Sequence, residues 1–409
     1  MERRARCALE VEMDLRKVSR STLLGFVFLT SYEPWQRPRT YRSELASFRV
    51  IRLVDGLQSP WSLAFLNQRE FLVTERAGRL RAVRSGRLDP SPIEGVPRVF
   101  EDKQGGLFDV VLHPNHGANR LVYLSYALPD STGASATLSV VRGRLQGNRL
   151  ETVESVFQAR ARGQGIHFGG RLAFDSALYL HITVGDRYVQ PDCRAGPIFE
   201  CSSTLATHPA QDLSSHAGKV IRLFEDGRVP ADNPFANRAG VRPEIWSYGH
   251  RNPQGLVFHP TTGDLWLTEH GPMGGDELNL ILAGRNYGWP IVGHGLHYDG
   301  TSIHEGIRRD GLEDSSFHWD STFGPSGLVV YNGEPFPHWR GHLFVGGLVS
   351  QRLVRIALHG RSPVATEVIV SNLGRIRDVR QGPDGYIYVV TDPRDDTLGA
   401  IYRIEPLAH

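Results

Sequence analysis

Two residues with the chemistry of an acid–base pair flank an apolar strand-turn-strand segment. His167 lies directly before the segment in Gly165–Leu172, and Asp186 follows it in Thr183–Arg187. An imidazole titrates near neutrality and can act as a general base. If the segment forms a hairpin, Asp186 comes close to His167, and a carboxylate raises the basicity of an imidazole. A histidine in such a place is more often structural, so the pair alone is only a hypothesis.

Arginine and amide groups precede two other apolar runs. Arg251 and Asn252 lie in the polar segment Tyr248–Gly255, where they could bind carbonyl or carboxylate oxygens or merely cap a loop. Arg375 and Arg377 are two residues apart, so on a strand both point to the same side. Two guanidiniums on one side suit a polyanionic ligand, although surface arginines are expected in a chain with so many of them.

The segment Thr268–Asn279 is rich in glycine and ends in carboxylates. Its turns expose backbone carbonyls, and Asp276 and Glu277 add acidic oxygens. Calcium binds such mixed oxygen ligands, but the order of acids is not that of an EF-hand loop. Gln104 lies in an equivalent place before another apolar run.

These polar segments are positioned by a repeated strand pattern. Six copies of an apolar strand, a turn and a second strand begin at Ser62, Gly106, Gly170, Gln254, Gly327 and Arg377. Repeats of about 40 residues or more with room for four strands predict β-propeller blades. We therefore predict an all-β, six-bladed propeller of four-stranded antiparallel blades. Its ring would be closed by strands near 47–53 and 399–404, and the longer copies would carry loop insertions. A two-domain β-sandwich protein is the alternative.

Composition agrees with this class and excludes others. The 44 glycines and 25 prolines disfavour a helical bundle, and the 40% hydrophobic residues exclude a disordered chain. A net charge of +2 without a basic run argues against nucleic-acid binding. Only three of the 46 basic residues are lysines, namely Lys17, Lys103 and Lys219.

The first 45 residues differ from the rest, so we assign 1–45 to an N-terminal segment and 46–409 to one propeller domain. An apolar stretch at Ser21–Thr30 follows basic residues, as in a signal peptide, which predicts a periplasmic or secreted protein. The true start could be Met13. The stretch is too short to span a membrane, so we expect no integral membrane span. Cys193 and Cys201 could form a disulfide or remain two thiols.

Eight motifs together resemble the soluble quinoprotein glucose/sorbosone dehydrogenase family, especially its bacterial aldose sugar dehydrogenases. They span roughly residues 48–405 and comprise Pro60–Phe65, Gln104–Val110, His167–Leu172, Ala210–Val220, Gly249–Gly255, Glu269–Pro272 with Asp276–Ile281, Asn286–Pro290, and Arg375–Val379.

The resemblance implies oxidation of an aldose at C1 to the lactone, with pyrroloquinoline quinone (PQQ) and calcium as cofactors. His167 would be the base that takes the proton of the anomeric hydroxyl, Asp186 would orient it, and Arg251 would polarise the quinone carbonyl. The residues that would hold the quinone and its three carboxylates are Gln104, Arg251, Asn252, Gly271, Pro272, Arg375 and Arg377. Carbonyls of Gly271 and Pro272 would bind one calcium, and Glu277 and Tyr287 match a second site.

One departure from the family weakens this interpretation. The family usually has a lysine after the strand of the fifth blade, and this chain has Val349 there; Arg352 is the nearest cation after it. A propeller that has lost the quinone and binds a sugar or protein partner is therefore an alternative. A calcium-dependent lactone or ester hydrolase is another. A small aldose is the expected substrate, the electron acceptor is unknown, and a monomer or homodimer is expected.

Overall fold

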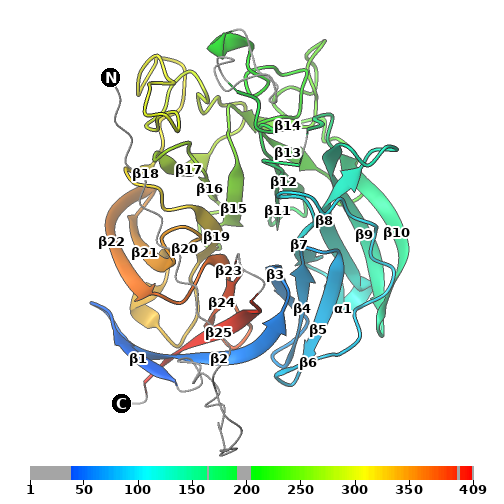
Figure 1. Ribbon diagram of the computed structural model, residues 1–409, viewed down its shortest axis with the longest axis vertical. Coiled ribbons are helices and arrows are strands. Elements are labelled where there is room, and N and C mark those ends of the chain that lie inside the picture. Colours follow the sequence, from blue (N-terminus) through cyan, green and yellow to red (C-terminus); the bar gives the residue numbers. More distant parts are fainter. Residues whose placement is uncertain (1–37, 164, 191–203, 394–396, 408–409) are drawn as a thin grey trace, which may run out of the picture.

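Six antiparallel sheets surround a common axis, as the ring of blades in Figure 1 shows. The computed structural model describes residues 38–163, 165–190, 204–393 and 397–407. Five sheets have four strands each, and the sixth has five. The predicted six-bladed propeller is confirmed; the additional strand β1 (Arg39–Arg42) extends the sixth blade at its outer edge.

Each of the first five blades takes its four strands from one continuous stretch of chain. In chain order the strands are β3 (Pro60–Phe65), β4 (Glu70–Glu75), β5 (Arg79–Arg84), β6 (Arg87–Leu88); β7 (Leu107–Leu112), β8 (Leu121–Pro129), β9 (Ala136–Gln146), β10 (Arg149–Gln158); β11 (Gly169–Phe174), β12 (Leu180–Val184), β13 (Lys219–Leu223), β14 (Ile245–Tyr248); β15 (Pro253–Phe258), β16 (Leu265–Glu269), β17 (Asp276–Ile281), β18 (Phe317–Trp319); β19 (Pro325–Val330), β20 (Leu343–Gly347), β21 (Arg352–His359), β22 (Ser362–Ser371).

The sixth blade closes the ring with both ends of the described chain. It combines β23 (Ile376–Gln381), β24 (Ile387–Thr391) and β25 (Gly399–Pro406) with β2 (Ser47–Leu57). Strand β2 pairs antiparallel with β25, with Val50 opposite Ile404. The predicted closure by the N- and C-terminal strands is therefore correct. It makes the blade depend on residues more than 350 positions apart in the sequence.

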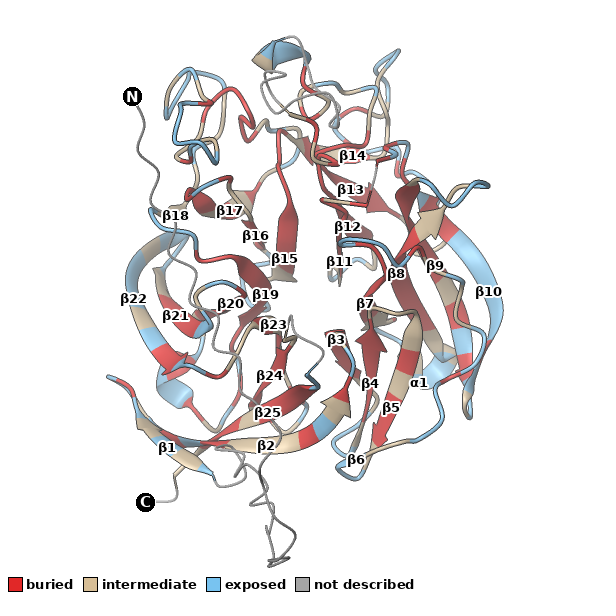
Figure 2. Cartoon of the chain, viewed as in Figure 1, coloured by how far each residue is buried: buried red, intermediate tan, exposed pale blue. Residues whose placement is uncertain are grey.

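The repeated apolar runs form the innermost strand of every blade. Each of the six predicted copies begins within two residues of the first residue of β3, β7, β11, β15, β19 or β23. The strands near the axis are buried on both faces, whereas outer strands such as β10 and β22 face solvent (Figure 2). Leu72 on β4 and Val122 on β8 have no exposed surface and belong to one apolar cluster between the first two blades.

Helical segments are few and short in the part of the chain that the structure describes. They are α1 (His116–Asn119) and the 3-10 turns Leu205–Thr207 and Pro337–Trp339. Among the described residues, no helix has the length and apolar character needed to cross a membrane. Residues 282–316, between β17 and β18, form one of the expected loop insertions. The predicted Cys193–Cys201 pair and the signal-like stretch lie outside the described residues.

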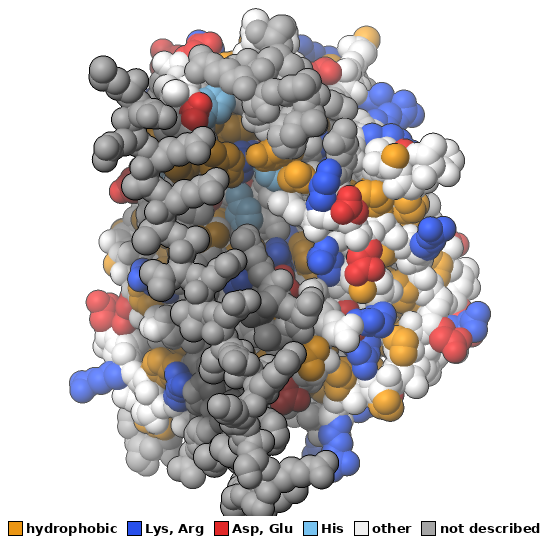
Figure 3. All heavy atoms as spheres, viewed as in Figure 1, with side chains coloured by type: hydrophobic (Ala, Val, Ile, Leu, Met, Phe, Trp, Pro, Cys, Tyr) orange, Lys and Arg blue, Asp and Glu red, His pale blue; other side chains and the backbone are white. Residues whose placement is uncertain are grey.

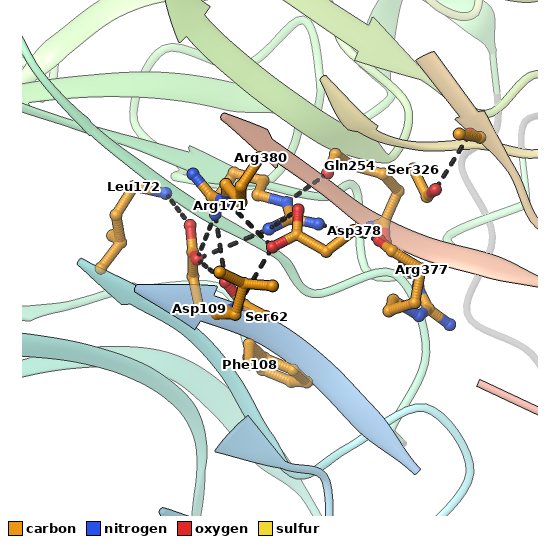
Figure 4. Close-up of polar contacts among 12 residues, drawn as sticks. Ser62, Phe108, Asp109, Arg171, Leu172, Gln254, Ser326, Arg377, Asp378 and Arg380 are labelled. Atoms are coloured by element: carbon orange, nitrogen blue, oxygen red, sulfur yellow. Dashed lines mark hydrogen bonds and ion pairs between the residues drawn. The ribbon is translucent and has the colours of Figure 1, made fainter. Parts of the chain in front are cut away.

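Buried charges tie the innermost strands together at the axis (Figure 4). Arg171 on β11 lies 2.9 Å from Asp378 on β23 and 3.5 Å from Asp109 on β7, measured between guanidinium nitrogen and carboxylate oxygen. Arg380 on β23 contacts the same two carboxylates at 2.9 and 2.7 Å. Arg171 also donates to the carbonyl of Gln254 on β15 at 2.6 Å. The side chain of Arg171 therefore links β11 to three other innermost strands, β7, β15 and β23.

We expect Arg171→Met to destabilise the protein by about 3–5 kcal/mol, because the substitution leaves Asp109 and Asp378 buried with less compensation. Urea unfolding measures the change. Arg49→Met, which breaks a partly exposed ion pair with Glu405, is the control and costs at most ~1 kcal/mol. Equal effects of the two substitutions would show that the axial cluster has no special role.

Candidate functional site

A cavity of about 380 Å³ opens at the end of the axis where the innermost strands begin. Because neighbouring strands are antiparallel, the start of each inner strand meets the end of the next strand there. Trp61, Phe108, Gly169 and Gln254 come from inner strands, and Asp392 follows β24. Histidine and basic side chains are visible near the middle of the face in Figure 3.

Most of the predicted site residues line this one cavity. They are Gln104, His167, Arg251, Asn252, Gly271, Pro272, Arg375 and Arg377. The set spans residues 104 to 377; five different segments between strands supply seven of its members, and Arg377 lies on β23. Asp186 lies behind His167, in a smaller pocket that His167 and Arg251 also line.

His167 and Asp186 form a direct pair. The distance from His167 Nδ1 to Asp186 Oδ1 is 2.7 Å, and both residues are almost completely buried. The His167 backbone has a positive φ of 48°, and its amide donates to Gln104 Oε1 at 2.9 Å. Since Nδ1 is occupied by Asp186, Nε2 is the ring nitrogen left to act on a ligand in the cavity.

A tryptophan from another blade holds Asp186 in place. Trp289 Nε1 donates to Asp186 Oδ2 at 2.8 Å, and the amide of Tyr188 donates to Oδ1 at 2.8 Å. In the sequence, Trp289 is only one residue of the motif Asn286–Pro290. The hydrogen bond joins positions 103 residues apart, so no local pattern could reveal it.

The environment keeps His167 neutral at pH 7. Burial lowers the pKa of His167 to about 4, although the negative charge of Asp186 opposes this; the nearby Arg251 lowers it further. Burial raises the pKa of Asp186, but the interaction with His167 outweighs it and brings that pKa to about 2. A neutral imidazole oriented by a carboxylate is the form that a general base requires.

Arg251 is directed toward the loop that follows β16. Its Nη1 donates to the carbonyls of His270 at 3.2 Å and Gly271 at 2.5 Å. Its backbone amide donates to Glu269 Oε2 at 2.7 Å, which fixes the start of the segment. The guanidinium therefore lies at the carbonyl where a calcium ion was predicted.

Two further arginines enter the cavity from the sixth blade. Arg375 donates to the carbonyls of Asp392 and Leu348, both at 3.2 Å. Arg377 lies 3.4 Å from Asp392 Oδ2 and donates to Gln254 Oε1 at 3.3 Å. Gln254 in turn donates to Asn252 Oδ1 at 3.1 Å. The buried Arg377 Nε has no hydrogen-bond partner among the described residues.

The residues predicted for metal binding lie in and beside the cavity. Asp276 accepts backbone amides of Gly271, Phe323 and Gly324 at 2.7–2.8 Å, so it anchors the Gly271–Pro272 loop. Glu277 and Tyr287 line a small adjacent pocket with Gly271 and Pro272. Burial, followed by the charge of Glu269, raises the pKa of Glu277 to about 8.

No group of three or more His, Cys, Asp or Glu side chains suited to a metal occurs among the described residues.

The position of the missing lysine also lies at the cavity. Val349 lines it and is 50% exposed, whereas Arg352 does not line it. Arg76 and Lys103 line the cavity from the first and second blades. Neither was predicted, because the sequence places them in loops without a distinctive motif.

Comparison with known proteins decides the family. The model of the glucose/sorbosone dehydrogenase family matches residues 57–403. The chain belongs to this family. It is 39% identical to the aldose sugar dehydrogenase YliI of Escherichia coli over 379 residues, which cover 91% of this chain and 95% of the relative.

Solved structures agree with this assignment. A crystal structure of a glucose dehydrogenase superposes with a TM-score of 0.79 at 44% identity, covering 88% of this chain and 99% of the other. The PQQ-bound aldose sugar dehydrogenase of Streptomyces coelicolor has a TM-score of 0.68 at 27% identity, covering 88% and 99%.

We expect the imidazole of His167 to titrate near pH 4, well below an ordinary histidine, because it is buried beside Arg251. Nuclear magnetic resonance of ring-labelled histidine measures this, and His167→Gln identifies the signal. In Asp186→Asn the midpoint falls further, since the charge that raises this pKa is lost. A midpoint at or above about 6.5 in the wild type would contradict this electrostatic picture.

Proposed function

We propose that the protein oxidises aldoses at C1 to the lactone with PQQ as cofactor. The observation that carries the proposal is that His167, paired with Asp186 behind it, lines the same cavity as Arg251, Arg375 and Arg377. Membership in the glucose/sorbosone dehydrogenase family and the PQQ-bound structural relative support it.

The cavity fits the quinone in charge and in hydrogen-bonding capacity. Five cationic side chains and two carboxylates line it, a formal charge of +3 with neutral histidines, which matches three carboxylates. The cations are Arg76, Lys103, Arg251, Arg375 and Arg377, and the carboxylates are Asp276 and Asp392. The unpartnered Nε of Arg377 is a buried donor of the kind that a bound anion satisfies.

The residues of the chain perform the proton chemistry. His167 Nε2 takes the proton of the anomeric hydroxyl, while Asp186 keeps Nδ1 protonated and stabilises the positive charge that forms. Trp289 holds Asp186 in the orientation this requires. When bound, the quinone would supply the electron-accepting group that this oxidation needs. Arg251, Asn252 and Gln104 orient the reactants around His167.

Calcium is a second part of the proposal. The carbonyls of Gly271 and Pro272 would bind it, but the Gly271 carbonyl accepts a hydrogen bond from Arg251. A metal ion bound there would share this carbonyl oxygen, which has two lone pairs, with the guanidinium. Asp276 holds the loop in either case, since its oxygens bind backbone amides. Glu277 and Tyr287 would serve a second calcium ion.

Reconstitution tests the function. With PQQ and calcium added, we expect dye-linked oxidation of an aldose panel, with the lactone as product. His167→Gln and Asp186→Asn should each lower kcat by about 10²- to 10⁴-fold and leave the Kd for the quinone within a few-fold. Absence of both quinone binding and sugar oxidation would reject the proposal and support instead the propeller that has lost the quinone, which Val349 favours. Quinone binding without oxidation of any sugar in the panel would reject aldoses as the substrate.

Calcium should stabilise the metal-free protein through Glu277. We expect saturating calcium to raise the Tm by on the order of 3 °C, and Glu277→Gln to remove most of this gain because the cation loses a carboxylate ligand. Differential scanning calorimetry measures both. Glu334→Gln, which removes an exposed carboxylate on a loop of the fifth blade, is the control. An equal calcium shift in Glu277→Gln would remove Glu277 from the metal site.

Export remains part of this proposal. It rests on the signal-like stretch at Ser21–Thr30 and predicts a mature N-terminus after that stretch in the exported protein.

A further inference from the structure

The three lysines of the chain have very different surroundings. Lys17 lies outside the described residues. Lys219 is buried, and its Nζ donates to the carbonyls of Pro209, Ala210 and Ala217 at 2.7–3.0 Å. Lys103 alone lines the cavity. It is therefore the one described lysine that could contact a ligand there.

The backbone of Lys103 is held firmly against the base. The amide of the next residue, Gln104, donates to the carbonyl of Gly165, and the Gln104 side chain accepts the amide of His167, both at 2.9 Å. Arg76 Nη1 donates to the Lys103 carbonyl at 2.9 Å. Lys103 also has a positive φ of 53°, which few residues other than glycine adopt. The loop thus fixes where this side chain begins.

The charged end of Lys103 differs from the other cations of the cavity. Arg377 is paired with Asp392, and Arg76 and Arg251 donate to backbone carbonyls. The Nζ of Lys103 has no hydrogen bond or ion pair with any residue in the described ranges. An ammonium at the edge of a cavity gains most from a ligand that brings an anionic oxygen.

We propose that Lys103 binds a carboxylate of the quinone and supplies, from the second blade, the ammonium that the family resemblance places at position 349. This inference rests on the proposed function. Without Lys103 the formal charge of the cavity is +2, one short of the three carboxylates. With it the charges balance, although the ammonium comes from a different side of the ring.

Titration of the apo-protein with PQQ at fixed calcium, followed by quenching of tryptophan fluorescence, tests this. Lys103→Met keeps the length of the side chain and removes its charge. We expect the Kd to rise about 5- to 30-fold, as for loss of a partly exposed charged hydrogen bond. Lys103→Arg should remain closer to the wild type. Arg87→Met removes a charge on the outer strand β6 and should leave the Kd unchanged.

Introducing a lysine in the fifth blade shows whether the affinity lost in Lys103→Met reflects the missing charge or a general disturbance of the structure. In the Lys103→Met background, Val349→Lys should recover most of the lost affinity, because it returns an ammonium to the same cavity. An unchanged Kd in Lys103→Met would overturn the inference while leaving the proposed function intact. If Lys103→Met leaves the Kd for the quinone unchanged and raises only the KM for acidic sugars, the inference is also overturned, because Lys103 would then bind the substrate and not the quinone. No quinone binding by the wild type would reject the proposed function itself.

Discussion

Two buried carboxylates, Asp109 and Asp378, lie on the axis of the propeller. Both contact the same two guanidiniums. Buried charges of this kind are costly unless every one is paired, so Arg171 and Arg380 can occupy few positions. The strands that carry these side chains are the innermost strands of the second, third and sixth blades. Their N-terminal ends, one to three residues before these side chains, carry residues that line the cavity. The geometry of the site therefore depends on an ionic cluster whose residues do not line the cavity.

The connection is direct at Gln254 and Arg377. Arg171 donates to the carbonyls of both residues, at 2.6 and 3.1 Å. Their side chains, which are joined by a hydrogen bond, face the cavity. A displacement of Arg171 would shift the cationic wall that is meant to receive carboxylates. The same burial that makes charges costly at the axis also favours the neutral form of His167, and Asp186 opposes this only in part.

Sequence patterns predicted the fold well because the propeller repeats a local signal. Each innermost strand is a short apolar run followed by a turn, and the copies at Gly106 and Gly170 are recognisable within their own residues. The pair His167 and Asp186 was also within reach, since one hairpin joins them. Trp289 and Lys103 were not. Their roles come from contacts across blades, between residues far apart in the chain, and neither has a local pattern that distinguishes it from a core tryptophan or a surface lysine.

The structure also shows how the cavity can be cationic in a chain with few lysines. Val349 lies at the cavity where the family resemblance expects a cation, yet Arg76 and Lys103 bring positive charge from other blades. A crystal structure of the protein grown with PQQ and calcium tests most directly whether this cavity receives the quinone. We expect the quinone in the cavity, with its carboxylates at Arg375 and Arg377 and its reactive carbonyl toward His167. An empty cavity at saturating quinone, or quinone bound elsewhere, would contradict it.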